Sequence, residues 1–306
     1  VAVFRNAEHM WYFDHDHNGT TDSTAPWSWG DHDLWKEAKP FVGDFDGGGM
    51  VNDVGLLIDG RHWVIDYEHD GLDPYPDTMG DETLPRLWGW WGEKEAKVIS
   101  LDYDRDGARD DIGYLQDVIW RFNTDHRNPG ETQSFTTFAG GQGVTAEPSD
   151  RPIAGDFNGD GYSDDVGFFR PSTRVWYYDY YHTGYINASS GQWGWSEDLP
   201  VVGDFDSDGL EDDLALFRPT DRKWRYDYDH DGTQDATSGP WGQIGYLPAA
   251  GDFDHDGYTD DLALYAPSSG DWYIDINHNS SSGSDLVVPG YACDGCQPIV
   301  GAFGFH

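Results

Sequence analysis

The sequence predicts an all-β protein, a six-bladed β-propeller with about four strands in each blade. Two phrases alternate along the chain: Gly-Asp-Phe-Asp followed by a Gly, paired acids and an apolar strand, and an apolar strand followed by a turn and a Trp-bearing strand. No segment has the pattern of a long amphipathic helix. With 306 residues, the chain is long enough for one large all-β domain or two average ones.

The first phrase sets the length of the repeat. Its aspartates recur about 50 residues apart, which suits a blade of four short strands. A degenerate copy of the phrase, Gly-Ala-Phe-Gly-Phe, occupies residues 301–305 near the end of the sequence. The acidic part of the phrase begins at Asp44, Asp102, Asp156, Asp204 and Asp252.

The second phrase reveals an offset between the two ends. The chain begins with a second phrase and ends with a first phrase, so the sixth unit is complete only if the termini meet. We therefore expect a ring closed by a blade that the N- and C-termini share. The tryptophans of the second phrase are expected to pack between blades; they are Trp11, Trp63, Trp120, Trp176, Trp224 and Trp272.

These repeats predict a single domain over 1–306. Its blades are expected at 41–98, 99–152, 153–200, 201–248, 249–298, and 299–306 together with 1–40. The less regular tryptophans are either core residues or exposed rings that stack on sugars; they are Trp27, Trp29, Trp88, Trp90 and Trp91.

The loop after the first strand of each unit contains the candidate metal ligands. Counting from its first Asp, polar oxygen-bearing residues, nearly all of them acids, occupy positions one, three, five and nine, a Gly occupies position six, and position seven can offer its carbonyl. Four units are complete. Their expected ligands are Asp102, Asp104, Asp106, Ala108 and Asp110; Asp156, Asn158, Asp160, Tyr162 and Asp164; Asp204, Asp206, Asp208, Leu210 and Asp212; and Asp252, Asp254, Asp256, Tyr258 and Asp260.

Carboxylates this close repel one another unless a cation lies between them. Several oxygen ligands in a flexible loop favour Ca²⁺ over Mg²⁺, which demands stricter geometry, and zinc would require His or Cys. We therefore expect four or more calcium sites. The alternative is an acidic, solvated turn that holds no metal.

Weaker sites are expected elsewhere. The first unit keeps Asp44, Asp46 and Asn52 but has a Gly at position five, and the last unit should hold no ion. A second carboxylate series follows the Trp-bearing strand, where a polar hairpin turn is the alternative reading. Two sets keep the spacing: Asp227, Asp229, Asp231 and Asp235, and Asp14, Asp16, Asn18 and Asp22. A third set, Asp66, Glu68 and Asp70, keeps only three acids. The turns at Asn123 and Asp179 are expected to hold no metal.

The phrase Gly-Asp-Phe-Asp-x-Asp-Gly-x-x-Asp, followed by Leu-Ala-Leu-Phe, resembles the FG-GAP/VCBS repeat. Such repeats form the propeller of integrin α chains and of many secreted microbial proteins. The resemblance covers essentially the whole chain and implies calcium in the loop between the first two strands of a blade. It also implies extracellular adhesion or ligand binding, although integrin propellers have seven blades and the count here is six.

Composition narrows the setting. The net charge of −39 argues against binding to nucleic acid or an anionic membrane surface, and no apolar run approaches the ~20 residues of a membrane span. No signal-type segment opens the chain at Val1, so it is expected to be mature or trimmed. Cys293 and Cys296 predict a local disulfide or two free thiols, and Asn18, Asn187 and Asn279 match the glycosylation pattern.

Three functions fit these observations. The first is a calcium-stabilised, secreted or surface-attached recognition module that binds a cell-surface glycan or protein. The second is a structural subunit that binds copies of itself in a surface layer or filament. The third is an enzyme on polysaccharide, which we do not expect because the sequence has no His-Glu-x-x-His, Gly-x-Ser-x-Gly or phosphate-loop motif. The insertion at 124–152 is the place where a catalytic cluster would be sought.

Overall fold

The computed structural model describes residues 2–5, 10–14, 21–26, 38–45, 51, 53–58, 62–66, 97–116, 119–124, 133–135, 144, 147–254, 256–277, 284–289 and 297–299. Every regular element within these ranges is a β-strand. The chain divides into two compact units. Unit 1 comprises 1–116, 121–133 and 293–306, and unit 2 comprises 117–120 and 134–292.

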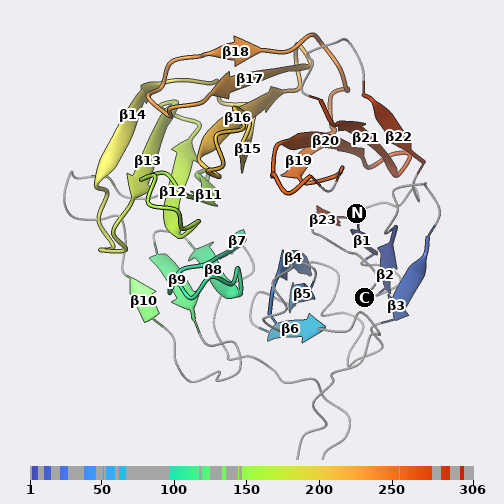
Figure 1. Cartoon of the computed structure of the whole chain (residues 1–306), viewed down its shortest axis with the longest axis horizontal. Coiled ribbons are helices and arrows are strands. Elements are labelled where there is room, and N and C mark those ends of the chain that lie inside the picture. The colour runs from blue at the N-terminus through green and yellow to red at the C-terminus, as the bar shows by residue number, and fades with distance from the viewer. Residues whose placement is uncertain are drawn as a thin grey trace, which may run out of the picture. The chain divides into compact units, whose positions relative to one another are not determined.

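Unit 2 contains three four-stranded antiparallel sheets whose strands follow chain order. Neighbouring blades touch through their first strands, β11 with β15 and β15 with β19, and the fourth strands lie farthest out (Figure 1). The strands are β11 (Arg151–Gly155), β12 (Asp165–Arg170), β13 (Val175–Asp179) and β14 (Ala188–Gln192); β15 (Leu199–Gly203), β16 (Asp213–Arg218), β17 (Lys223–Asp227) and β18 (Ala236–Thr237); and β19 (Leu247–Gly251), β20 (Asp261–Ala266), β21 (Asp271–Asp275) and β22 (Leu286–Val288).

Three further sheets involve the rest of the described chain. The sheet β10-β9-β8-β7 is four-stranded, whereas β4-β5-β6 has three strands. The strands are β1 (Ala2–Arg5), β2 (Met10–Phe13), β3 (Ser23–Pro26), β4 (Lys39–Gly43), β5 (Asp53–Ile58), β6 (His62–Asp66), β7 (Lys97–Leu101), β8 (Asp111–Gln116), β9 (Ile119–Asn123), β10 (Gln133–Phe135) and β23 (Gln297–Ile299).

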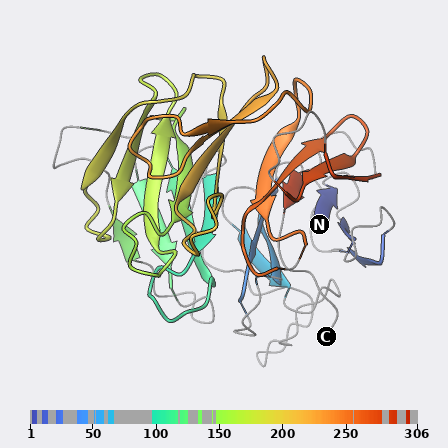
Figure 2. The same cartoon turned by 45° about the horizontal axis from the view of Figure 1, so that its top comes forward.

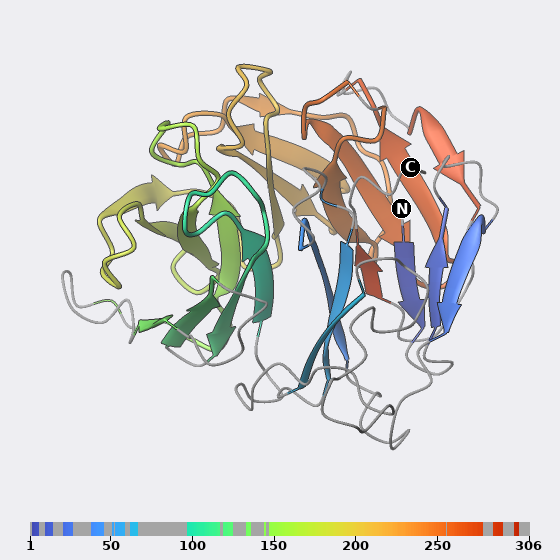
Figure 3. The same cartoon turned by 60° about the horizontal axis from the view of Figure 1, so that its bottom comes forward.

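The two ends of the chain contribute to one sheet. β23 pairs antiparallel with β1, with Ala2 opposite Ile299, and the order β23-β1-β2-β3 completes a four-stranded blade. In Figure 3 the red β23 lies beside the blue β1. The prediction that the N- and C-termini share a blade is confirmed.

The blade count differs from the prediction. The described residues form five four-stranded blades, not six, because only three strands of the 41–98 unit are present among them. Residues 67–96, which follow β6 in that unit, lie outside the described residues. The fold is an all-β propeller built from four-stranded blades, as the sequence predicts.

Burial along the strands explains their sequences. The second strands β12, β16 and β20 are buried along their whole length, because a blade packs against a neighbour on both faces. The third strands β13, β17 and β21 alternate between half-buried and buried positions, as a strand with one wetter face does. Figure 2 shows the strands of the β11–β14 blade side by side.

The core tryptophans lie where the sequence places them. All six tryptophans of the second phrase are buried to 2% exposure or less, and Trp176 and Trp224 share core clusters with Leu216 and Leu264 of the following blades. Trp193 and Trp241 reinforce two of them: their rings lie 5.7 and 5.8 Å from those of Trp176 and Trp224. The irregular tryptophans at 27, 29, 88, 90 and 91 lie outside the described residues.

Candidate metal centres

The loop between the first and second strands of a blade, here called the first-strand loop, folds around the side chain of its first Asp. In the 204 loop, Asp204 Oδ1 accepts the amide of Asp208 at 2.9 Å and Oδ2 accepts the amide of Gly209 at 3.0 Å. The Gly at position six has positive φ in every described first-strand loop, 94° at Gly209, which explains why glycine is needed there. The loops at 102, 156 and 252 repeat the bond from the position-six amide to position one.

The tenth residue of the loop, which the sequence reading did not assign, is part of the site. Asp213 is 1% exposed at the start of β16, and its Oδ2 accepts the amide of Asp206 at 2.7 Å. Asp111, Asp165 and Asp261 make the equivalent bond. The signal was visible in the paired acids that end each phrase, but the reading assigned only the first acid of each pair.

Carboxylates converge in these loops. Single oxygens of Asp204, Asp206 and Asp213 lie within 4.8 Å of one another, and so do those of Asp102, Asp104 and Asp111. In the 252 loop the corresponding group is Asp252, Asp254 and Asp256. Position nine is absent from these groups.

Position nine is nonetheless electrostatically linked to the rest of its loop. Burial raises the pKa of Asp212 to about 7, and the charges of Asp208, Asp156 and Asp206 add to the rise. Asp110 behaves alike, with a pKa of about 7 raised by burial and then by Asp106 and Asp104. A neighbouring cation would relieve this repulsion and favour the ionised carboxylates.

Buried carboxylate oxygens that lack a hydrogen-bond donor indicate whether a cation fits the first-strand loops. Within the described residues, Oδ1 of Asp111, Asp213 and Asp261 is buried and has no hydrogen-bond partner. A buried carboxylate oxygen without a partner is costly, and a bound cation would satisfy it. The donor set is entirely oxygen, which suits Ca²⁺, so the residues present fit that ion.

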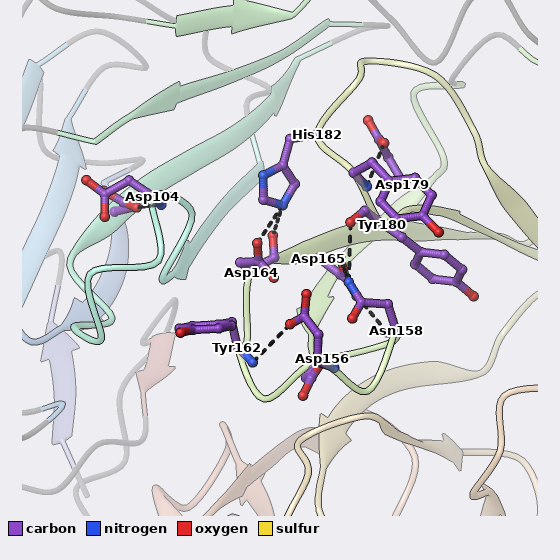
Figure 4. A network of polar contacts seen from close by, with 12 residues as sticks. Asp104, Asp156, Asn158, Tyr162, Asp164, Asp165, Asp179, Tyr180 and His182 are labelled. Atoms are coloured by element: carbon purple, nitrogen blue, oxygen red, sulfur yellow. Dashed lines mark hydrogen bonds and ion pairs between the residues drawn. The ribbon is translucent and has the colours of Figure 1, made fainter.

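The 156 loop departs from the others because nearby side chains of the same blade contact its carboxylate oxygens (Figure 4). Asn158 Nδ2 donates to Asp165 Oδ1 at 3.0 Å, the atom that lacks a partner in Asp213. His182 Nε2 lies 3.0 Å from Asp164 Oδ2 and 2.8 Å from the Asp164 carbonyl oxygen. Asp164, Asp165 and His182 therefore form a mixed nitrogen and oxygen group that the sequence reading did not find.

Three first-strand loops, those at 44, 156 and 204, also contact the blade that follows them in the chain. The Asp204 amide donates to the Thr259 carbonyl at 3.0 Å, and the Asp156 amide donates to the Glu211 carbonyl at 2.9 Å. The acceptor is position eight of the next loop in both cases. In unit 1 the Asp44 amide donates in the same way to the Arg109 carbonyl at 3.0 Å.

The loop between the third and fourth strands, here called the third-strand loop, contains the second carboxylate series. Oxygens of Asp227, Asp229 and Asp235 lie within 4.8 Å of one another, whereas Asp231 is not in this group. Asp14, Asp22 and Asp66 are described, and Asp14 and Asp66 are buried. The remaining predicted positions, Asp16, Asn18, Asp46, Asn52, Glu68, Asp70, Asn279, Cys293 and Cys296, lie outside the described residues, as do 301–305 and most of 125–146. Asn187 is exposed.

At the opposite end of two blades, a buried ion pair was also missed by the sequence reading. Arg218 donates through Nε and a terminal nitrogen to both oxygens of Asp198, each at 2.6 Å. Arg170 and Asp150 form the same pair at 2.9 and 2.7 Å. The Arg-Pro pairs at 170–171 and 218–219, each 20 residues after an Asp, were the available signal.

One blade of the chain matches the sequence model of a known protein family. The family model described as FG-GAP repeat matches residues 244–284, which include the 252 loop and the strands β19 to β21. The chain is a β-propeller that contains an FG-GAP repeat. The matched segment of this FG-GAP propeller has the same loop, strand order and buried Trp as the blades at 153–200 and 201–248.

Two solved structures are similar to the chain at low sequence identity. The crystal structure of BBS1N in complex with ARL6DN, soaked with lead, is 9% identical, with a TM-score of 0.45, covering 82% of this chain and 67% of that one. The Niastella koreensis GH74 enzyme is 14% identical, with a TM-score of 0.40; 76% of this chain is covered, but only 29% of the enzyme. No curated protein matches the FG-GAP propeller significantly. Among the described residues, no helix is long and apolar enough to cross a membrane.

Proposed function

We propose that this FG-GAP propeller is a calcium-stabilised extracellular recognition module that binds a glycan or a protein through the end of its blades that carries the loops. First-strand and third-strand loops leave the same end of an antiparallel blade. The observation that carries the proposal is a set of exposed tyrosines at this end of unit 2. Their exposures are 41% for Tyr162, 68% for Tyr181, 51% for Tyr185 and 43% for Tyr258.

Tyrosine suits recognition because it offers a large ring and a polar tip at low conformational cost. Tyr162 and Tyr258 occupy position seven of first-strand loops, so a cation held by the loop would fix the backbone that carries the ring. Tyr181 and Tyr185 lie in the third-strand loop of the same blade as Tyr162. The net charge of −39 favours a neutral or cationic partner over an anionic one.

The calcium part of the proposal rests on the first-strand loops. When bound, the ion would supply positive charge to Asp204, Asp206 and Asp213 and to the equivalent residues of the other loops. These side chains would hold the ion, and the bond from the Asp204 amide to the Thr259 carbonyl would hold the loop against the following blade.

The test is a glycan array and a panel of purified surface proteins, probed in millimolar calcium and in chelator. The double variant Tyr181→Ala/Tyr185→Ala should bind at least about tenfold more weakly than the unaltered chain, because the loss of two stacking rings removes more than about 1.4 kcal/mol. Ile244→Ser is the matched control, since Ile244 is 76% exposed in a connection at the other end of the blades. Equal binding by the tyrosine variant would contradict the proposal.

A further inference from the structure

We infer that the third-strand loop at 227–235 is a second type of divalent-cation site, and that its ion locks the β15–β18 blade onto the β11–β14 blade. The site is distinct from the first-strand loops and does not depend on them. Three observations support the site. They are a buried carboxylate oxygen without a donor, a matched loop in which a hydroxyl binds the equivalent oxygen, and contacts between this loop and the neighbouring blade.

Asp227 is the centre of the site. It is 0% exposed, and its Oδ2 accepts the amide of Gly232 at 2.9 Å. Its Oδ1 is buried and has no hydrogen-bond partner among the described residues. One oxygen each of Asp227, Asp229 and Asp235 lies within 4.8 Å of the other two, so two further carboxylates converge on the aspartate whose oxygen lacks a donor.

The loop at 179–187 shows what fills this place when acids are absent. Its turn is the same: Asp179 Oδ2 accepts the amide of Gly184 at 2.7 Å, and the Asn187 amide donates to the Tyr178 carbonyl at 2.8 Å, as the Asp235 amide does to Tyr226 at 2.9 Å. Here, however, Asp179 Oδ1 accepts the Thr183 hydroxyl at 3.2 Å and the Thr183 amide at 3.1 Å.

The exchange between the two loops is residue for residue. Tyr181, Thr183 and Asn187 stand where the 227 loop has Asp229, Asp231 and Asp235. The neutral loop satisfies its buried aspartate internally, whereas the acidic loop leaves an oxygen for an external cation. The three carboxylates of Asp227, Asp229 and Asp235 form an oxygen donor set that suits Ca²⁺.

The 227 loop docks on the neighbouring blade. The Gly191 amide at the end of β14 donates to the Asp231 carbonyl at 3.2 Å. The His230 ring lies 5.8 Å from Phe157 and 5.7 Å from Tyr178, both of the β11–β14 blade. An ion that orders residues 229–232 would therefore also hold the carbonyl and the ring that join the blades.

The test replaces the acidic loop with its neutral counterpart. The triple variant Asp229→Tyr/Asp231→Thr/Asp235→Asn copies the 179 loop, which folds with a hydroxyl on its buried aspartate, so the variant should fold. Calcium per chain is counted by equilibrium dialysis and atomic emission, and exchange of the Gly191 amide is followed by NMR. We expect one ion fewer in the variant. In the unaltered chain, chelator should speed Gly191 exchange at least about tenfold, and in the variant calcium should have no effect on it.

Two controls separate this inference from the first-strand sites. Asp206→Ala/Asp208→Ala in the same blade should lose one ion yet keep calcium-dependent protection of Gly191, and Thr183→Ala should leave the ion count unchanged. A triple variant with the full ion count would overturn the inference, as would Gly191 exchange that ignores chelator in the unaltered chain. Failure of Asp206→Ala/Asp208→Ala to lose an ion would instead contradict the first-strand sites alone.

Discussion

The glycines that precede the 156 and 204 first-strand loops are needed because the next blade lies against them. A Cβ on Gly203 would lie 2.3 Å from the Thr259 carbonyl oxygen, and a Cβ on Gly155 would lie 2.4 Å from that of Glu211. These carbonyls accept the amides of Asp204 and Asp156. The two residues of the Gly-Asp pair therefore serve the same contact. The glycine leaves room for a carbonyl of the next blade, and the aspartate amide donates a hydrogen bond to that carbonyl.

Replacing Gly203 should therefore loosen the seam between the β15–β18 and β19–β22 blades. We expect Gly203→Ala to lower the free energy of unfolding by about 1–3 kcal/mol, since the added methyl meets backbone that cannot rotate away. Denaturant unfolding measures it, and Thr259→Ala, which keeps the carbonyl, should be near neutral. A Gly203→Ala protein as stable as the unaltered chain would contradict the seam contact.

Ligand positions could be predicted only in part from spacing. Position one and the position-six Gly followed from the repeat, because turn geometry depends on local sequence. Asp213 did not, since its role depends on an amide seven residues earlier that folding brings to its carboxylate. The pairing of His182 with Asp164 links residues of two different loops, and no spacing within one phrase reveals it.

Among the elements, the connection from the fourth strand to the next blade is fastened by the Arg218–Asp198 pair. Asp198 is 0% exposed and also accepts the Trp195 amide at 2.8 Å, while the Trp195 ring lies 4.2 Å from the Arg218 guanidinium carbon. The β19–β22 blade has Tyr246 and Ala266 at the equivalent positions, with Tyr246 stacked on Tyr273 at 5.4 Å. The β19–β22 blade therefore shows how this connection packs without an Arg–Asp ion pair.

This comparison yields a prediction on stability. Asp198→Ala leaves a buried guanidinium unpaired and should cost about 3–5 kcal/mol. The double change Asp198→Tyr/Arg218→Ala, which copies the β19–β22 blade, should cost less than the single change. Thermal and denaturant unfolding of both variants measure the difference. A double variant less stable than Asp198→Ala would show that the pair is not the main constraint on this connection.

The strands themselves were predictable to different degrees. Second and third strands follow from apolar runs and Trp-bearing alternation, because burial dictates their residues. Fourth strands do not: β14 is Ala-Ser-Ser-Gly-Gln with mostly exposed positions and β18 has two residues. An exposed outer strand buries little side-chain area, so its sequence is weakly constrained.

At the scale of the whole molecule, charge and fold are linked. A chain with a net charge of −39 gathers many of its acids in loops at one end of its blades, where they repel one another. The shared terminal blade was predictable from the offset of the two phrases, which depends only on chain order. The count of four-stranded blades differs from the predicted six: five are present among the described residues, which include three strands of the 41–98 unit.

The central claim is that calcium in the first-strand loops stabilises this fold. Each site bound only by the native state adds RT ln(1 + [Ca²⁺]/Kd), about 2.7 kcal/mol at a hundred times Kd. The most direct test is thermal unfolding in millimolar calcium, in chelator, and in chelator with excess magnesium. We expect chelation to lower Tm by about 10 °C or more, with little restoration by magnesium, and a smaller calcium effect in Asp204→Ala/Asp208→Ala. A melting curve that is the same in calcium and in chelator would contradict the account.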